Sequence, residues 1–319
     1  MTLTNPSHNW EEEEVENPVG STAWIFNSLT NELTVHRTVE TADGGKAPWN
    51  VLWKDIKSAV LVDGVTTIHE RAFERCIGLT LVVIPDSVVT VGNTAFGKCS
   101  FTSIKIPRSV TSFGGNPFAE CENLNIIDVS ENQNLILVSG VLMDKEMIKI
   151  IYCNPSKSGD YSIPNTVTAI YAGAFAGCDR LRSITIPSSV VSIGSRAFHH
   201  CKQLSSIEVP NSVKEIGEGA FALCYELESI TIPGSVETLG ANLFTECSKL
   251  SEIVVFGEGE NLKEVDGVMF SGDMARLIWC SRRKSGSYEI PHTVKTIDED
   301  AFYNCKKLTS ITIQTPSQK

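Results

Sequence analysis

The chain lacks several features that mark common classes of protein. No apolar run approaches the ~18 residues that a membrane-spanning helix needs. Basic residues are outnumbered, since 27 lysines and arginines stand against 38 aspartates and glutamates and give a net charge of −11. A nucleic-acid binder needs a basic stripe that displaces counterions, and anionic lipid attracts the same positive charge. The sequence therefore predicts neither nucleic-acid binding nor membrane insertion.

Motifs of catalysis and of metal binding are also missing. The chain has no Gly-x-Ser-x-Gly nucleophile elbow and no Walker loop for phosphate. Among six histidines only His199 and His200 are adjacent, at variable positions before Cys201, and we expect both to face solvent. Cysteines spaced about 23 residues apart do not fit the paired spacing of zinc sites. We therefore expect no cofactor, no metal and no enzymatic activity.

The N-terminus lacks the apolar stretch of a signal peptide. Residues 1–19 are polar, include the acidic run Glu11–Glu14 and are predicted to form a disordered tail. A chain that is not secreted by this route and a chain whose leader has been removed would both show this beginning. A cytoplasmic location is therefore one alternative.

A repeat of 22 or 23 residues dominates the rest of the chain. Its most regular mark is a phenylalanine followed three residues later by a cysteine, in eight copies: Phe73/Cys76, Phe96/Cys99, Phe118/Cys121, Phe175/Cys178, Phe198/Cys201, Phe221/Cys224, Phe244/Cys247 and Phe302/Cys305. A fixed period of this length is typical of a leucine-rich-repeat solenoid, in which stacked units bury a shared core.

Each repeat predicts one coil of that solenoid. Alternating aliphatic residues, as in 181–186, indicate a short strand, and the following proline ends it because proline cannot donate to a ladder. A glycine such as Gly194 then suggests a turn with positive φ, and the Ala-Phe segment suggests a single helical or 3-10 turn. The predicted fold is an α/β-type solenoid, a right-handed coil with parallel strands on one face and short helical or 3-10 turns on the other. Eleven strands are expected, ending near Leu61, Ile84, Ile106, Val129, Ile163, Ile186, Val209, Ile232, Val255, Ile290 and Ile313.

Eight of the ten cysteines share one repeat position, so we expect them to form a column inside the coil. Neighbouring strands lie about 4.8 Å apart, which falls within the Cα separations of disulfides. Disulfides are therefore not excluded, but a column of small buried thiols is the simpler interpretation.

Two units carry an insert of about a dozen residues, within 138–164 and 265–291. Each insert has a turn between two apolar runs, which predicts a β-hairpin that projects from the coil. Residues 20–55 are predicted to form an N-terminal hairpin cap that covers the first coil with Trp24, Trp49 and Trp53, because a solenoid exposes its terminal core otherwise. The solenoid is assigned to 56–313 and a polar tail to 314–319. The uncovered final strand is expected to allow self-association through the C-terminal coil.

The repeat resembles the BspA-like leucine-rich repeats, a subtype related to the treponemal repeat class, over about residues 56–313. The resemblance implies a non-enzymatic protein of the cell surface or a secreted one, with an adhesin-like role toward host or microbial macromolecules. The same features also fit an intracellular scaffold that binds a protein partner. The partner would be a protein or a glycan.

Two groups of residues are candidates for ligand binding. The first lies on the outward face of the strands and comprises Arg182, Ser183, Thr185, Glu208, Glu228, Thr231 and Glu252. These residues form either a solvated surface or the recognition face that solenoids offer to ligands. The second comprises the aromatic residues of the insert-bearing units, Tyr152, Tyr161, Trp279 and Tyr288, which either bind a ligand or pack in the core.

Overall fold

The computed structural model describes residues 2–4, 23–39, 47–257 and 260–313. The chain divides into two compact units, Met1–Lys145 and Glu146–Lys319. The boundary falls in the turn of the first predicted insert, so the predicted solenoid 56–313 extends over both units.

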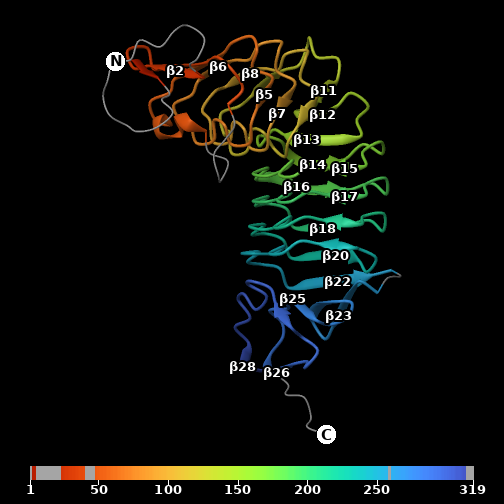
Figure 1. Cartoon of the computed structure of the whole chain (residues 1–319). Coiled ribbons are helices and arrows are strands. Elements are labelled where there is room, and N and C mark those ends of the chain that lie inside the picture. Colours follow the sequence, from red (N-terminus) through yellow and green to blue (C-terminus); the bar gives the residue numbers. More distant parts are fainter. Residues whose placement is uncertain (1, 5–22, 40–46, 258–259, 314–319) are drawn as a thin grey trace. The chain divides into compact units, whose positions relative to one another are not determined.

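The first unit begins with antiparallel strands and continues with parallel ones (Figure 1). Its elements are β1 (Thr2–Thr4), β2 (Trp24–Asn27), β3 (Glu32–Val35), the 3-10 helix η1 (Pro48–Leu52), β4 (Ser58–Leu61), β5 (Thr67–Ile68), β6 (Leu81–Val83), β7 (Thr90–Val91), β8 (Ser103–Lys105), β9 (Ser112–Phe113), β10 (Ile126–Asp128), β11 (Leu135–Val138) and β12 (Val141–Asp144). Strands β1, β2 and β3 pair antiparallel, and β3, β4 and β6 pair parallel. Strand β1 departs from the predicted disordered tail, whose other residues lie outside the described part of the chain, as does the tail 314–319.

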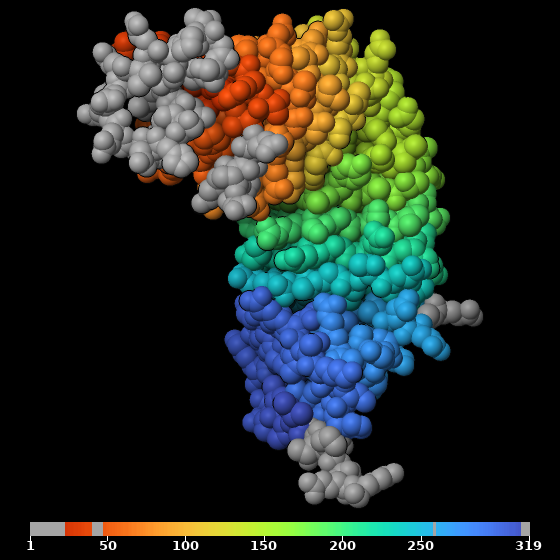
Figure 2. Space-filling model, in the orientation of Figure 1, coloured from red at the N-terminus to blue at the C-terminus, as the bar shows by residue number. Residues whose placement is uncertain are grey.

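The second unit is a stack of coils, visible as successive layers in the space-filling view (Figure 2). Its elements are β13 (Lys149–Cys153), β14 (Ser158–Ser162), β15 (Ala169–Ile170), β16 (Arg180–Thr185), β17 (Ser192–Ile193), β18 (Ser206–Glu208), β19 (Glu215–Ile216), β20 (Ser229–Pro233), β21 (Thr238–Leu239), β22 (Glu252–Phe256), β23 (Leu262–Val265), β24 (Val268–Ser271), β25 (Arg276–Cys280), β26 (Gly286–Ile290), β27 (Thr296–Ile297) and β28 (Leu308–Ile313). Parallel ladders join β14 to β16, β18 to β20 and β22, and β26 to β28.

The eleven predicted strands are confirmed as β4, β6, β8, β10, β14, β16, β18, β20, β22, β26 and β28. A second series of parallel strands was not predicted, and all of them except the five-residue β13 are two residues long. It joins β5, β7 and β9 in the first unit and β13, β15, β17, β19 and β21 in the second. Apart from β5 and β13, these strands hold the residues after the proline, where the apolar spacing of three does not show the alternation of a strand.

The predicted helical turns at Ala-Phe are wrong. The left-handed residues Arg196 and His200, with φ of 55° and 63°, flank the Ala197-Phe198 segment and prevent a right-handed turn from continuing. The N–H groups of Arg196, Phe198 and His200 donate to carbonyl oxygens of the next coil, while those of Ala197 and His199 close short i−3 turns. The only helix among the described residues is η1. The fold is therefore a β-solenoid and not the predicted α/β-type solenoid.

The repeated glycine also has a different role from the predicted one. Gly194, Gly217 and Gly240 do not have positive φ. A Cβ atom on Gly217 would lie 2.2 Å from the backbone nitrogen of Ser195 in the preceding coil. Glycine is needed there because the backbones of adjacent coils approach too closely for any side chain.

Columns of stacked side chains fill the interior of each unit. Rings of Phe73 and Phe96 stack at 5.3 Å in the first unit, and Phe175, Phe198, Phe221 and Phe244 stack at 5.3–6.0 Å in the second. These side chains are almost fully buried, so they supply much of the hydrophobic stabilisation of the fold.

The predicted cap contacts the first of these columns. Trp49 lies 5.5 Å from Phe73, and its indole N–H donates to the Ala72 carbonyl at 2.8 Å. Trp24 packs edge-on against Trp49 at 6.2 Å, whereas Trp53 is half-buried. Two of the three predicted tryptophans therefore extend the aromatic column.

All ten cysteines are free, and all except Cys305 are buried, which confirms the thiol column. Within this column the thiol of Cys99 donates to the Phe73 carbonyl at 3.2 Å, and Cys224 donates to Phe198 at 3.1 Å. A small side chain with a weak donor thus fits the position because it both fills the slot and satisfies a carbonyl of the preceding coil.

The inserts form hairpins, but both hairpins are built into the core, and Val141, Leu142 and Met143 of β12 in the first insert are fully inaccessible. Strands β23 and β24 pair antiparallel around the turn Asp266-Gly267, whose positive φ values of 49° and 75° suit a tight hairpin turn. Strand β24 then pairs antiparallel with β25. Val268, Met269 and Phe270 of β24 are almost inaccessible as well, so the prediction that the hairpins project from the coil is wrong for both inserts.

Candidate interaction surface

The first group of predicted site residues lies on one continuous face of the second unit. We call this face, made by the outward residues of β16, β18, β20 and β22, the strand surface (Figure 1). Register places Ser229 between Ser206 and Glu252, and Thr231 between Glu208 and Val254. Of the predicted residues, Arg182, Ser183, Thr185, Glu208, Glu228 and Glu252 are exposed, and Thr231 is half-buried. The outward orientation of Ser183, Thr185, Glu208, Thr231 and Glu252 follows from the period of two in each strand, whereas Arg182 lies at an irregularity of β16 and Glu228 just before β20.

Carboxylates give the strand surface an acidic character. Glu208 and Glu228 have no ion-pair partner among the described residues, and Glu252 lies 3.5 Å from the guanidinium of Arg283. Ser183 donates to the carboxylate of Asp160 at 2.7 Å. A row of carboxylates separated by hydroxyl side chains can accept hydrogen bonds and ion pairs from a basic ligand.

A pocket of about 500 Å³ adjoins this surface, and Glu252 belongs to both. It is lined by Ser251, Glu252, Ile253 and Val254 of the β22 region, by Glu264, Asp266 and Gly267 of the hairpin turn, and by Trp279, Ser281, Arg283, Lys284 and Ser285 at and after the end of β25. We call it the charged pocket. It unites one residue from each predicted group, Glu252 and Trp279, which the sequence placed in competing sites.

Ion pairs and hydrogen bonds hold the walls of the charged pocket in place. The ammonium of Lys284 donates to the carboxylate of Asp266 at 2.6 Å and to its carbonyl at 2.7 Å, and lies 4.6 Å from the centre of the Tyr288 ring. The hydrogen bond from Lys284 holds the pKa of Asp266 below its usual range. Glu264 accepts the N–H of Gly267 at 2.6 Å. Asp266 and Lys284 therefore form a fixed wall, and they are already satisfied by each other.

Two other charges of the charged pocket are more accessible to a ligand. The side chains of Arg283 and Glu252 are 68% and 52% exposed, and their 3.5 Å separation is longer than that of a strong ion pair. Ser281 donates its hydroxyl to the Ser251 carbonyl at 2.7 Å. A ligand group can thus displace Arg283 at little cost and pair with the carboxylate of Glu252.

The second predicted group does not form a common site. Tyr161 and Tyr288 belong to different coils and pack against Phe175 at 5.9 Å and Phe302 at 6.2 Å. Burial raises the pKa of each tyrosine to about 12. Tyr152 is almost inaccessible, so Trp279 alone of the four lines the charged pocket.

The histidine pair lies away from the charged pocket. His199 and His200 are half-buried, which corrects the expectation that they face solvent. Nδ1 of His200 lies 3.4 Å from Asp179, and the thiol of Cys201 donates to the Phe175 carbonyl at 3.2 Å. Burial raises the pKa of Cys201, which disfavours the thiolate.

The described residues contain no cluster of three or more His, Cys, Asp or Glu that would suit a metal ion. In the same part of the chain, no helix has the length and apolar character needed to cross a bilayer.

Comparison with protein families identifies the repeat. The model of the BspA type leucine-rich repeat region matches residues 52–158, 145–274 and 280–319, in six copies. The chain belongs to the BspA-type leucine-rich repeat family. This family assignment covers most of the chain and agrees with the coils and columns described above. No curated protein is similar enough in sequence to count as a relative.

Several solved structures share the fold of this BspA-type protein. A leucine-rich repeat protein from Eubacterium ventriosum is 21% identical, with a TM-score of 0.59 over 91% of this chain and 82% of that one. A leucine-rich cell surface protein from Faecalibacterium prausnitzii is 28% identical, with a TM-score of 0.52 over 64% of this chain and 60% of that one. The pneumococcal vaccine antigen PcpA is 16% identical, with a TM-score of 0.50 over 92% of this chain and 98% of that one.

Sequence reasoning missed the charged residues of the charged pocket. The two inserts align at a spacing of 127 residues, so Glu264, Asp266 and Arg283 correspond to Leu137, Ser139 and Ser156. The second insert thus acquired charges that the first does not carry, whereas Lys157 and Lys284 match. A position-by-position comparison of the inserts would have singled out this pocket.

Proposed function

We propose that this BspA-type protein is an adhesin-like interaction module that binds a protein ligand along the strand surface of its second unit. The observation that carries the proposal is the shared position of Glu252, which joins the acidic strand surface to the charged pocket. A ligand strand or loop that crosses the surface can therefore place one anchoring side chain in the pocket. Large surfaces with one deep anchor are typical of specific protein interfaces.

The chemistry of the charged pocket favours a basic anchor. Glu252 and Glu264 offer carboxylate oxygens, and the indole of Trp279 forms part of the wall. A lysine or arginine side chain can pair with the carboxylates while its aliphatic stem packs on the indole. Since Lys284 and Asp266 neutralise each other, the remaining acidic groups, together with Glu208 and Glu228, favour a ligand with a basic segment.

A location at the cell surface is part of the proposal. It is supported by the family and by the Faecalibacterium prausnitzii structure, which is described as a leucine-rich cell surface protein. The alternative is an intracellular scaffold with a protein partner, and the ten free cysteines favour it because reducing compartments keep thiols free. Protease treatment of intact cells separates the two, since only a surface protein is cut before lysis.

Binding of purified protein to immobilised collagen, fibronectin, laminin and mucin tests the interaction. We expect saturable binding to at least one of these proteins that weakens between 50 mM and 150 mM salt, as screening of charge pairs requires. The triple variant E208Q/E228Q/E252Q removes three charges from the strand surface and is expected to weaken binding at least tenfold.

A matched control uses three exposed glutamates away from the strand surface. E215Q/E218Q/E246Q changes the net charge by the same amount and is expected to bind like the unmodified protein. Equal weakening by both triple variants would show that only net charge matters and would contradict the assigned surface. Binding to none of the four proteins would contradict the adhesin role.

A further inference from the structure

The cysteine column has a regular hydrogen bond that five of its thiols share. The Sγ atoms of Cys99, Cys121, Cys201, Cys224 and Cys247 lie 3.0–3.2 Å from the phenylalanine carbonyl oxygen of the preceding coil. Each of these thiols therefore has its own acceptor and is held apart from its neighbours.

The two inserts break this pattern in the same way. Strand β13 ends in the extra cysteine Cys153 and β25 ends in Cys280. The next cysteine of the column lies farther from any acceptor, since Cys178 is 3.8 Å from the carbonyl oxygen of Cys153 and Cys305 is 3.4 Å from that of Cys280. In these two places the column thiol also lies near the next carbonyl, since Cys178 is 3.8 Å from the carbonyl oxygen of Asn154 and Cys305 is 3.8 Å from that of Ser281.

Geometry brings the sulfurs of each pair around one carbonyl. The Sγ atoms of Cys280 and Cys305 both lie 3.8 Å from the carbonyl oxygen of Ser281, and that of Cys305 also lies 3.4 Å from the carbonyl oxygen of Cys280. Two thiols that share one carbonyl oxygen in this way can approach disulfide length by rotation about their side-chain bonds. The thiols of the regular coils would first have to give up their short S–H···O bonds.

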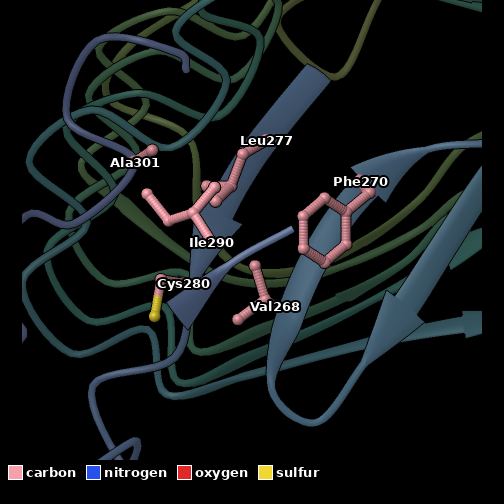
Figure 3. Close-up of a cluster of buried hydrophobic side chains, with 6 residues drawn as sticks. All are labelled: Val268, Phe270, Leu277, Cys280, Ile290 and Ala301. Carbon is pink, nitrogen blue, oxygen red and sulfur yellow. The ribbon is translucent and has the colours of Figure 1, made fainter. Parts of the chain in front are cut away.

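Access to solvent separates the two pairs. Cys153 and Cys178 are both completely buried. Cys280 is buried beside Ile290 and Ala301 at the end of β25 (Figure 3), but its partner Cys305 is the one cysteine of the chain that is not buried. A small reagent can therefore reach Cys305 without unfolding of the chain, and it cannot reach the other pair.

We propose that Cys280 and Cys305 form a redox-active dithiol that is oxidised to a disulfide by low-molecular-weight disulfides such as oxidised glutathione. The Cys305 thiolate attacks one sulfur of the reagent, forms a mixed disulfide and releases one thiolate. The thiol of Cys280 then loses its proton to solvent and attacks the Cys305 sulfur, which releases the second thiolate. Two protein thiols and one disulfide thus become one protein disulfide and two small thiols.

Local interactions support Cys305 as the attacking group. The hydrogen bond from Cys280 lowers the pKa of Cys305, and the nearby guanidinium of Arg282 acts in the same direction. Burial and the same contact raise the pKa of Cys280, which therefore acts second. This inference does not depend on the proposed ligand binding.

Thiol mapping of the native protein tests the proposal. The protein is incubated with oxidised glutathione at pH 8, alkylated, unfolded, alkylated again with a second reagent and analysed by mass spectrometry. We expect one linked peptide pair, Cys280–Cys305, while the other eight thiols react only after unfolding. Reduction by dithiothreitol should restore ten thiols.

Three variants keep the test decisive. Cys305→Ser should abolish the reaction, Cys280→Ala should leave a stable mixed disulfide at Cys305, and the matched first-insert variant Cys178→Ser should still form the Cys280–Cys305 disulfide. Ten free thiols after incubation of the unmodified protein, or a disulfide between any other pair, would overturn the proposal.

Discussion

At the scale of single residues, a glycine in each coil sets how closely the coils stack. We expect Gly217→Ala to destabilise the protein by about 1–3 kcal/mol, because its Cβ would lie 2.2 Å from the Ser195 nitrogen and overpacking forces the backbone apart. Denaturant unfolding measures the change. The exposed neighbour Glu218→Ala is the control and should stay within about 0.5 kcal/mol. An equally small effect of Gly217→Ala would show that the spacing between adjacent coils accommodates a Cβ atom at this position.

The buried thiols make stability depend on alkaline pH. Burial raises the pKa of Cys76, Cys121 and Cys247 from 9.0 to about 12. Above pH 9 the unfolded chain loses these protons while the native chain keeps them, so the stabilisation is complete below pH 9 and disappears as the pH rises toward 12.

A comparison with one alanine variant isolates this contribution. Between pH 8 and pH 10, the unmodified protein should lose about 1.4 kcal/mol more stability than Cys247→Ala, as one thiol with these two pKa values requires. Identical pH profiles would mean that Cys247 ionises as easily in the native state as in the unfolded one.

Residue patterns predicted the core well and the backbone less well. The spacing of phenylalanine and cysteine identified the buried columns because those positions recur in every coil. The left-handed conformation of Arg196 and His200 could not be predicted from the sequence, since most coils have a residue other than glycine at the equivalent positions. Their conformation is imposed by hydrogen bonds to the next coil, which a single repeat does not reveal.

At the scale of elements, Arg276 links the second insert to the coil before it and, through an ion pair, to the coil after it. Arg276 of β25 makes two hydrogen bonds to Asp298, at 2.6 and 2.7 Å, and also donates to the carbonyl oxygens of Leu239 and Gly240 at 2.9 Å. The side chains are 27% and 9% exposed, so the pair is largely shielded from water.

Removal of one partner should therefore be costly. We expect Asp298→Ala to destabilise the protein by about 2–3 kcal/mol, because it leaves the shielded guanidinium without its carboxylate. The double variant R276M/D298L should lose less than Asp298→Ala alone, since it leaves no unpaired charge. Thermal or denaturant unfolding of the single and double variants measures the difference, and strictly additive losses would show that the two side chains do not interact.

The elements themselves were predictable to different degrees. The eleven predicted strands follow from the alternation of inward residues and, in seven of them, from the proline at the end of the strand. The burial of the second hairpin does not, because its apolar residues are equally compatible with a projecting ribbon that packs on a partner. Only the contacts of Val268, Phe270 and Leu277 with the last coils show that it belongs to the core.

At the scale of the whole molecule, the sequence predicted a binding face but not its anchor. The outward positions of the strands, such as Glu208 and Glu252, follow directly from the period of two. The charged pocket could not be predicted because it joins β22, the Asp266-Gly267 turn and the segment after β25, which come together only through the insert. Self-association through the C-terminal coil stays a prediction.

Hydrogen–deuterium exchange of the protein, with and without a saturating matrix protein or mucin that it binds, tests the assigned surface most directly. We predict that binding slows exchange in residues 251–254, 264–267 and 279–285, which line the charged pocket, and in the neighbouring strands β18 and β20. Hydrogen exchange in residues 215–223, which comprise β19 and the turn after it, should be unchanged. Protection confined to residues 215–223 or to the first unit, with no change around the charged pocket, would contradict the proposed binding surface.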